Sequence, residues 1–229
     1  MTGLWYWTPR PRPERRVFEG EFVRLEPLGV ERHGDGLYAA SAMDDSDMRF
    51  RYLPDESPDS YESFLPWLER AVASEDPMFF AVIDLASGRV AGRQTLMRID
   101  PANGVAEIGN ILWSSIIARK PAATEAFFLF ARHIFDDLGY RRFEWKCDNL
   151  NAPSKRAALR FGFQFEGIFR QHLVIKGRNR DTAWFSIIDS EWPAVRRALE
   201  AWLAPSNFDE SGTQITRLTQ MRERVAPSR

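Results

Sequence analysis

The feature that most constrains the fold is an alternation of strand and helix patterns over residues 105–161. Apolar residues alternate over 105–113 and 142–148, as they do in strands, whereas they recur at helical spacing over 121–138. A second helix is expected over 151–161. Because a helical crossover returns the chain in the same direction, the two strands are predicted to be parallel and adjacent.

The remaining strands are predicted to pair antiparallel. Ser87-Gly88 and Asn103-Gly104 are turn dipeptides between strand patterns, so the first half forms a meander. A long hairpin and a closing helix follow the second helix. The expected strands are 22–28, 78–84, 90–99, 105–113, 142–148, 163–175 and 182–188, and the other helices are 30–43, 60–73 and 190–203. The predicted fold class is α+β: a mostly antiparallel twisted sheet of about seven strands with one parallel pair, flanked by helices.

Length and composition favour one large domain. The 229 residues carry a net charge of −1 and are 44% apolar, which is typical of a globular chain. We expect an extended arm over 1–20, a single domain over 21–203, and a polar, irregular tail over 204–229. The arm combines Trp5, Tyr6 and Trp7 with prolines, so it is expected to dock on the domain or on a second subunit. A homodimer is compatible with such an arm.

Charge and cysteine usage exclude several classes of function. The near-neutral charge disfavours binding to nucleic acid or to an anionic membrane. Cys147 is the single cysteine, and the three histidines lie far apart, so no metal site is expected. The N-terminus lacks a secretory apolar region and no apolar run is long enough to span a bilayer. These features predict a cytoplasmic protein.

The start of the helix at Pro121 has the character of an anion site. Free amides and the helix dipole attract negative charge there, and small residues at 122 and 123 leave the backbone approachable. Arg119 and Lys120 add positive charge beside it. The alternative is an ordinary helix start with two solvated basic residues.

Three segments together resemble the GNAT superfamily of acetyl-coenzyme A-dependent N-acetyltransferases, and within it the Rim-type (RimJ/RimL-like) ribosomal-protein N-terminal acetyltransferases. The segments are RKPAATEA at 119–126, LGYRRFEWKCDNLNAPSKRAALRFGFQFEGIFR at 138–170 and KGRNRDTAWFSIIDSEW at 176–192. The resemblance extends over about residues 18–202. It implies the GNAT fold, with acetyl-CoA as cosubstrate and no metal.

The resemblance also implies the residues that hold acetyl-CoA. The family's Gln/Arg-x-x-Gly-x-Gly/Ala element binds the pyrophosphate through backbone amides; this chain keeps Arg119 but has Ala122 and Thr124 at the glycine positions. The Asn-x-x-Ser motif after the second parallel strand faces the pantetheine arm or simply caps its helix. The implied binding residues are Asn110, Ile111, Leu112, Trp113, Arg119, Lys120, Ala122, Ala123, Thr124, Glu125, Asn151, Ser154 and Arg156.

Two side chains are the implied catalysts. Glu107 corresponds to the acidic strand residue that serves as general base in several relatives, with Glu125 and Glu166 as rivals. Many relatives protonate the leaving thiolate with a tyrosine, but that position is Ala158 here, so Ser154 is expected to supply the proton. The structural alternatives are a glutamate on an exposed sheet face and a first-turn serine that satisfies backbone amides.

The sequence therefore predicts acetyl transfer to a primary amine by direct attack, the acceptor being a small molecule or a peptide. Cys147 is expected to be a buried strand residue rather than an acyl carrier. Arg170, Arg178, Arg180 and Asp181 cluster at the terminal hairpin, where they suit either an acidic acceptor or pairing of Arg180 with Asp181. The alternative function is a catalytically inactive CoA-binding sensor or scaffold.

Overall fold

The molecule is built on one eight-stranded sheet, which the computed structural model describes over residues 3–225. The strand order is β1-β2-β3-β4-β5-β6-β8-β7. The strands are β1 (Phe18–Glu19), β2 (Val23–Pro27), β3 (Met78–Asp84), β4 (Arg89–Asp100), β5 (Val105–Trp113), β6 (Arg142–Asp148), β7 (Gln164–Ile175) and β8 (Arg178–Ile188). All neighbours pair antiparallel except β5 and β6, which are parallel. The predicted mixed sheet with one parallel pair is confirmed.

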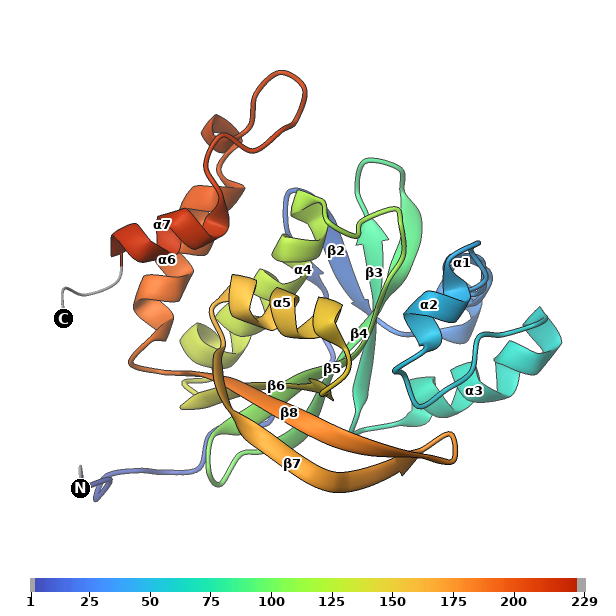
Figure 1. Cartoon of the computed structure of the whole chain (residues 1–229), viewed down its shortest axis with the longest axis horizontal. Coiled ribbons are helices and arrows are strands. Elements are labelled where there is room, and N and C mark those ends of the chain that lie inside the picture. Colours follow the sequence, from blue (N-terminus) through green and yellow to red (C-terminus); the bar gives the residue numbers. More distant parts are fainter. Residues whose placement is uncertain (1–2, 226–229) are drawn as a thin grey trace.

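Helices cover both faces of this sheet. They are α1 (Val30–Ser41), α2 (Ser46–Phe50), α3 (Tyr61–Ala73), α4 (Pro121–Arg132), α5 (Ala152–Phe161), α6 (Trp192–Leu203) and α7 (Leu218–Val225). Alternate residues of β3 separate the two cores: Phe79 and Ala81 pack with α1 and α3, whereas Phe80 and Val82 pack with α4. Figure 1 shows α1, α2 and α3 together on one side of the strands. Within residues 3–225, every helix is too short or too polar to cross a bilayer.

Besides the edge strand β1, which lies within the expected arm, three elements differ from the sequence expectation. The helix expected over 121–138 is α4 followed by a π-helical turn at His133–Asp137. The short α2 was not predicted, because five residues carry too little periodicity to be recognised. The tail is not irregular throughout: it contains α7, whose Leu218 is buried against the main core. A short polar helix of this kind owes its stability to packing on its neighbours, which the local sequence does not report.

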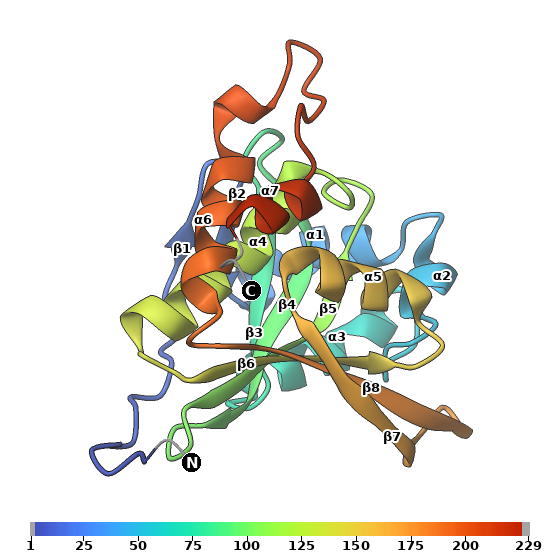
Figure 2. The same cartoon turned by 60° about the vertical axis from the view of Figure 1, so that its left-hand side comes forward.

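The N-terminal arm docks on its own domain. The indole Nε1 of Trp7 donates to the carbonyl of Ala102 at 2.8 Å, and the hydroxyl of Tyr140 donates to the carbonyl of Pro11 at 3.1 Å. Figure 2 shows the arm running down from β1 to the turn between β4 and β5. Trp5 and Tyr6 remain exposed.

Candidate active site

The site lies where the two parallel strands separate. β5 and β6 pair only from Val105 opposite Arg142 to Ile108 opposite Trp145. β6 then continues along β8 to Asp148. β5 bends away at a bulge against β4, where Asn110 adopts a left-handed φ of 48° that asparagine tolerates better than most residues. A cavity of about 270 Å³ lies between the diverging ends.

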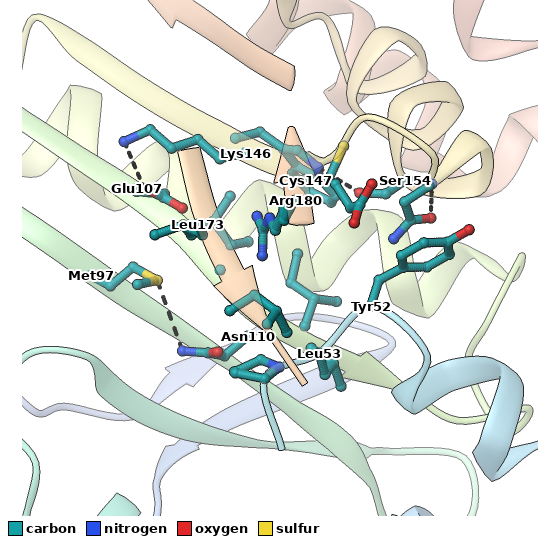
Figure 3. A pocket seen from close by; sticks show the side chains of 18 of the residues that line it. Tyr52, Leu53, Met97, Glu107, Asn110, Lys146, Cys147, Ser154, Leu173 and Arg180 are labelled. Atoms are coloured by element: carbon teal, nitrogen blue, oxygen red, sulfur yellow. Dashed lines mark hydrogen bonds and ion pairs between the residues drawn. The ribbon is translucent and has the colours of Figure 1, made fainter. Parts of the chain in front are cut away.

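This cavity brings together residues from distant parts of the chain. Predicted site residues that line it are Glu107, Asn110, Ile111, Asn151 and Ser154. The α2 helix and the loop after it supply the opposite wall, including Tyr52 and Leu53 (Figure 3). These two were not predicted, since loops that close a site carry no fixed pattern.

Glu107 is buried on the sheet face that carries α1 and α3, and it is not a lone carboxylate. Its Oε2 accepts from Arg98 Nη1 at 2.7 Å and lies 3.0 Å from Lys146 Nζ. Lys146 also pairs with Glu144, the residue opposite Glu107 across the parallel register, at 2.7 Å. The other oxygen, Oε1, faces Gly109, where an added Cβ would lie 3.5 Å from it. One carboxylate oxygen is therefore fixed by cations while the other faces the bulge.

Arg98 and Lys146 are partners of Glu107 that sequence reasoning missed. Each lies on a strand next to Glu107, so their convergence depends on the register between strands. One signal was present: Glu144 and Lys146 are both charged and stand on the same side of a strand flanked by buried residues. Charged residues on a buried strand face indicate an ion-pair network.

Ser154 lies on the opposite side of the cavity, in the first turn of α5. Its backbone N–H donates to Asn151 Oδ1 at 3.1 Å, and its Oγ accepts from Trp145 Nε1 at 2.9 Å. Trp145 thereby holds the hydroxyl oxygen, and the hydroxyl lies next to the Cys147 thiol. Asn151 caps the helix, as the capping interpretation of the sequence expected.

Cys147 is a buried strand residue, as predicted. Burial raises the pKa of its thiol, and the hydrogen bond with Ser154 opposes that shift. A buried thiol with a raised pKa is a poor nucleophile. The environment of Cys147 therefore argues against an acyl-enzyme.

The start of α4 differs from that of α5 because it lacks a side-chain cap. Lys120 is the N-cap residue and makes no capping bond, and the first turn begins with Ala123 N–H donating to Lys120 O at 3.2 Å. Arg119 adopts a left-handed φ of 64°, a conformation unfavourable for a side-chain-bearing residue. Ala122 and Ala123 are too small to shield the amides near them. The start of α4 therefore lacks the side-chain acceptor that Asn151 provides for α5, and its residues lie outside the lining of the cavity.

The rest of the predicted binding residues are held by protein contacts or lie outside the cavity lining. Thr124 Oγ1 accepts from Arg160 Nη1 at 3.0 Å, and Leu112 is buried. Trp113 Nε1 donates to Gln94 Oε1 at 3.1 Å. Arg156 is exposed on α5.

The two rivals for the general base have structural partners. The carboxylate of Glu125 accepts the backbone amides of Glu21, Phe22 and Val23 at 2.7–2.8 Å. Its side chain therefore serves the β1–β2 turn. Glu166 pairs with Arg142 at 2.5 Å, and this partner lowers the pKa of Glu166.

The cluster at the terminal hairpin divides into two parts. Asp181 accepts from the amide of Gln171 at 2.8 Å and from Asn179 Nδ2 at 2.9 Å, so it does not pair with Arg180. Arg170 and Arg178 are exposed, whereas Arg180 lines the cavity.

Comparisons with known proteins agree with this architecture. Residues 23–164 match the family model described as an acetyltransferase (GNAT) domain. A crystal structure of a GCN5-related N-acetyltransferase from Brucella melitensis is 63% identical, with a TM-score of 0.95 over 96% of this chain and 100% of that one. A probable GNAT-family acetyltransferase from Chromobacterium violaceum is 40% identical, with a TM-score of 0.77 over 84% and 96% of the two chains.

A curated relative shows the same relationship at lower identity. The uncharacterized N-acetyltransferase p20 of Bacillus licheniformis is 27% identical over 66% of this chain and 90% of its own length. The family model covers more than half of the chain, and the parallel strands diverge around a cavity. This chain belongs to the GNAT family of N-acetyltransferases.

Proposed function

We propose that the protein transfers an acetyl group from acetyl-CoA to a primary amine by direct attack, with both substrates in the cavity between β5 and β6. The observation that carries the proposal is the end of strand pairing after Ile108 and Trp145. It opens a cavity in the sheet that Glu107 lines from one side and Ser154 from the other. Direct attack requires such an arrangement, because two reactants must be aligned in one place.

We assign the diphosphate to the start of α4 and the pantetheine arm to the cavity. The uncapped start of α4 presents the backbone of Ala122, Ala123 and Thr124, with Arg119 and Lys120 beside it. When bound, acetyl-CoA supplies a thioester whose carbonyl carbon is open to attack by an amine. The backbone of Asn110 to Trp113 is our candidate for the donors to the carbonyl oxygen. Asn151 and Ser154 are assigned to the pantetheine arm, and the exposed Arg156 to the 3′-phosphate.

Two proton transfers complete the reaction. A nitrogen–carbon bond forms as the carbon–sulfur bond breaks, so the nitrogen loses a proton and the sulfur gains one. Glu107 Oε1 accepts the amine proton, directly or through water, while Arg98 and Lys146 hold Oε2 in place. Ser154 Oγ donates a proton toward the sulfur, with Trp145 Nε1 fixing the oxygen.

The finer assignment is to the Rim-type branch, with a small-molecule amine or a peptide N-terminus as acceptor. The sequence motifs over 119–126 and 138–170 support this branch.

A homodimer is also proposed, since Trp5 and Tyr6 remain exposed on the docked arm. Light scattering of the full chain and of Trp5→Ala tests the dimer, which should weaken in the variant.

A thiol-release screen tests the activity. Purified protein with acetyl-CoA is offered amino acids, polyamines and peptides, and free CoA is measured. Amine-dependent release of CoA supports the proposal. Calorimetric uptake of acetyl-CoA without release by any amine would favour a sensor, and no uptake at millimolar concentration would overturn acetyl-CoA as the cosubstrate.

A further inference from the structure

Arg180 differs from every other cation around the active-site cavity in lacking an acidic partner. Arg98 pairs with Glu107, and Lys146 pairs with both Glu107 and Glu144. Arg49, at the α2 wall, forms a two-bond pair with Asp45. Within residues 3–225 the guanidinium of Arg180 makes no ion pair, and its buried Nε has no hydrogen-bond partner.

The fold explains how this side chain reaches the cavity. β6 ends at Asp148, which lies opposite Thr182 of β8, and β8 extends beyond that point. Arg180 therefore stands past the end of β6, paired across the hairpin with Leu173 of β7. Figure 3 shows its guanidinium turned into the space between Glu107 and the Cys147–Ser154 side.

The guanidinium of Arg180 is partly buried and has no anion in contact with it among the described residues. Burial is the main influence on its pKa and lowers it, while Asp148 and Glu107 act in the opposite direction without contacting it. An arginine stays charged in proteins and carries donors in a fixed fork that matches a carboxylate. A partly buried guanidinium without a partner is costly unless an acceptor group arrives.

We propose that Arg180 binds a carboxylate of the acceptor, so that the preferred acceptors carry a carboxylate close to the reacting amine. This inference rests on the proposed acetyl transfer. The carboxylate comes from one of two sources: the α-carboxylate of a free amino acid, or the acidic side chain of a peptide's first residue. The cavity of about 270 Å³ suits a group of this size.

The experiment compares acids with their amides. Kinetics at saturating acetyl-CoA and calorimetry on CoA-saturated protein use each of several amino acids beside its α-amide. They also use peptides beginning with Asp beside peptides beginning with Asn. The wild type should prefer the acid in one of the two series, which identifies the source. In Arg180→Gln the KM of that acid should rise roughly 10- to 100-fold, because a charge-assisted hydrogen bond is lost.

Controls separate this role from folding and from cosubstrate binding. The amide's KM and the KM of acetyl-CoA should not change in Arg180→Gln, and Arg180→Lys should recover part of the preference. Arg178→Gln removes an exposed arginine of the same hairpin and should leave all values unchanged. The ratio of acid to amide within one variant is insensitive to partial unfolding.

Three results would overturn the inference. They are equal use of acid and amide by the wild type, no binding of any acid in the panel, and an Arg180→Gln defect confined to acetyl-CoA. Equal use of acid and amide would leave the proposed acetyl transfer standing. Failure of that transfer would appear separately, as acetyl-CoA that is not taken up or not consumed with any amine.

Discussion

The two consecutive strand–helix units, β5–α4 and β6–α5, have the same topology, but they differ in how their backbone hydrogen bonds are completed. β6 is regular along β8, and α5 begins with Asn151 capping the amide of Ser154. β5 is bulged at Asn110, and α4 begins without a side-chain cap after Arg119 turns through a left-handed conformation.

The contrast indicates that the two units have different roles in the site. Backbone donors that the protein leaves uncommitted are available to a ligand, so β5–α4 is suited to binding. Side chains held by a completed network keep one orientation, so β6–α5 is suited to presenting Ser154 toward the cavity. Glu107 stands at the junction, in the part of β5 that still pairs with β6.

The largest expected effect concerns Glu107 at that junction. Glu107→Gln keeps the shape of the side chain but removes its capacity to accept a proton, so kcat should fall about 100-fold or more. Acetyl-CoA affinity, measured by calorimetry, should change little. Glu144→Gln is the matched control, since Glu144 lies opposite Glu107 and shares Lys146. Two results would show that the ion-pair network has only a structural role. One is an equal loss of kcat in Glu107→Gln and Glu144→Gln, and the other is a kcat of Glu107→Gln equal to that of the wild type between pH 6 and 9.

The second effect tests the uncapped helix with one substitution that has two opposite consequences. Lys120 has the extended backbone of an N-cap residue, so Lys120→Asp should cap α4 and raise the free energy of unfolding by about 0.5–1 kcal/mol. The same carboxylate accepts hydrogen bonds from the backbone amides of the first turn and repels the phosphates. Acetyl-CoA should therefore bind at least about tenfold more weakly. Lys120→Gln, which only removes the charge, should show a smaller loss of affinity. Unchanged affinity in Lys120→Asp would place the diphosphate elsewhere.

Much of this contrast was predictable from the sequence because it depends on local patterns. The strand and helix periods over 105–161 predicted the parallel pair, and the small residues after Pro121 predicted an open helix start. The bulge at Asn110 was not predictable, because it arises from the mismatch between β5 and β4 rather than from asparagine itself.

The charged groups of the site were predictable only in part. Glu107 could be singled out, but its pairing with Arg98 and Lys146 depends on strand register, which no single segment encodes. The same holds for Glu125, whose carboxylate is used by three amides about a hundred residues earlier in the chain.

The third effect tests whether Ser154 acts as an acid or as part of the α5 scaffold. Ser154→Ala should lower kcat about tenfold without weakening acetyl-CoA binding. This is less than a general acid usually contributes, because a serine hydroxyl is a weak acid. Trp145→Phe removes the donor to Ser154 Oγ but keeps the hydroxyl, so it should lower kcat less. A solvent isotope effect on kcat that is lost in Ser154→Ala would support proton donation. Near-full turnover in Ser154→Ala would leave the hydroxyl only its structural hydrogen bond with Trp145.

The smallest expected effect concerns the cap of α5 and is the counterpart of the Lys120 test. Asn151→Ala should lower the free energy of unfolding by about 1 kcal/mol, because the Ser154 amide loses its acceptor. Asn151→Asp, which keeps an oxygen at the same place, should restore that stability. Denaturant unfolding measures both variants, and calorimetry measures their affinity for acetyl-CoA. If Asn151 also contacts the pantetheine arm, Asn151→Ala weakens binding beyond its effect on folding. If Asn151 only caps, the two helix starts respond oppositely: α4 gains stability and loses ligand, whereas α5 loses stability and keeps ligand.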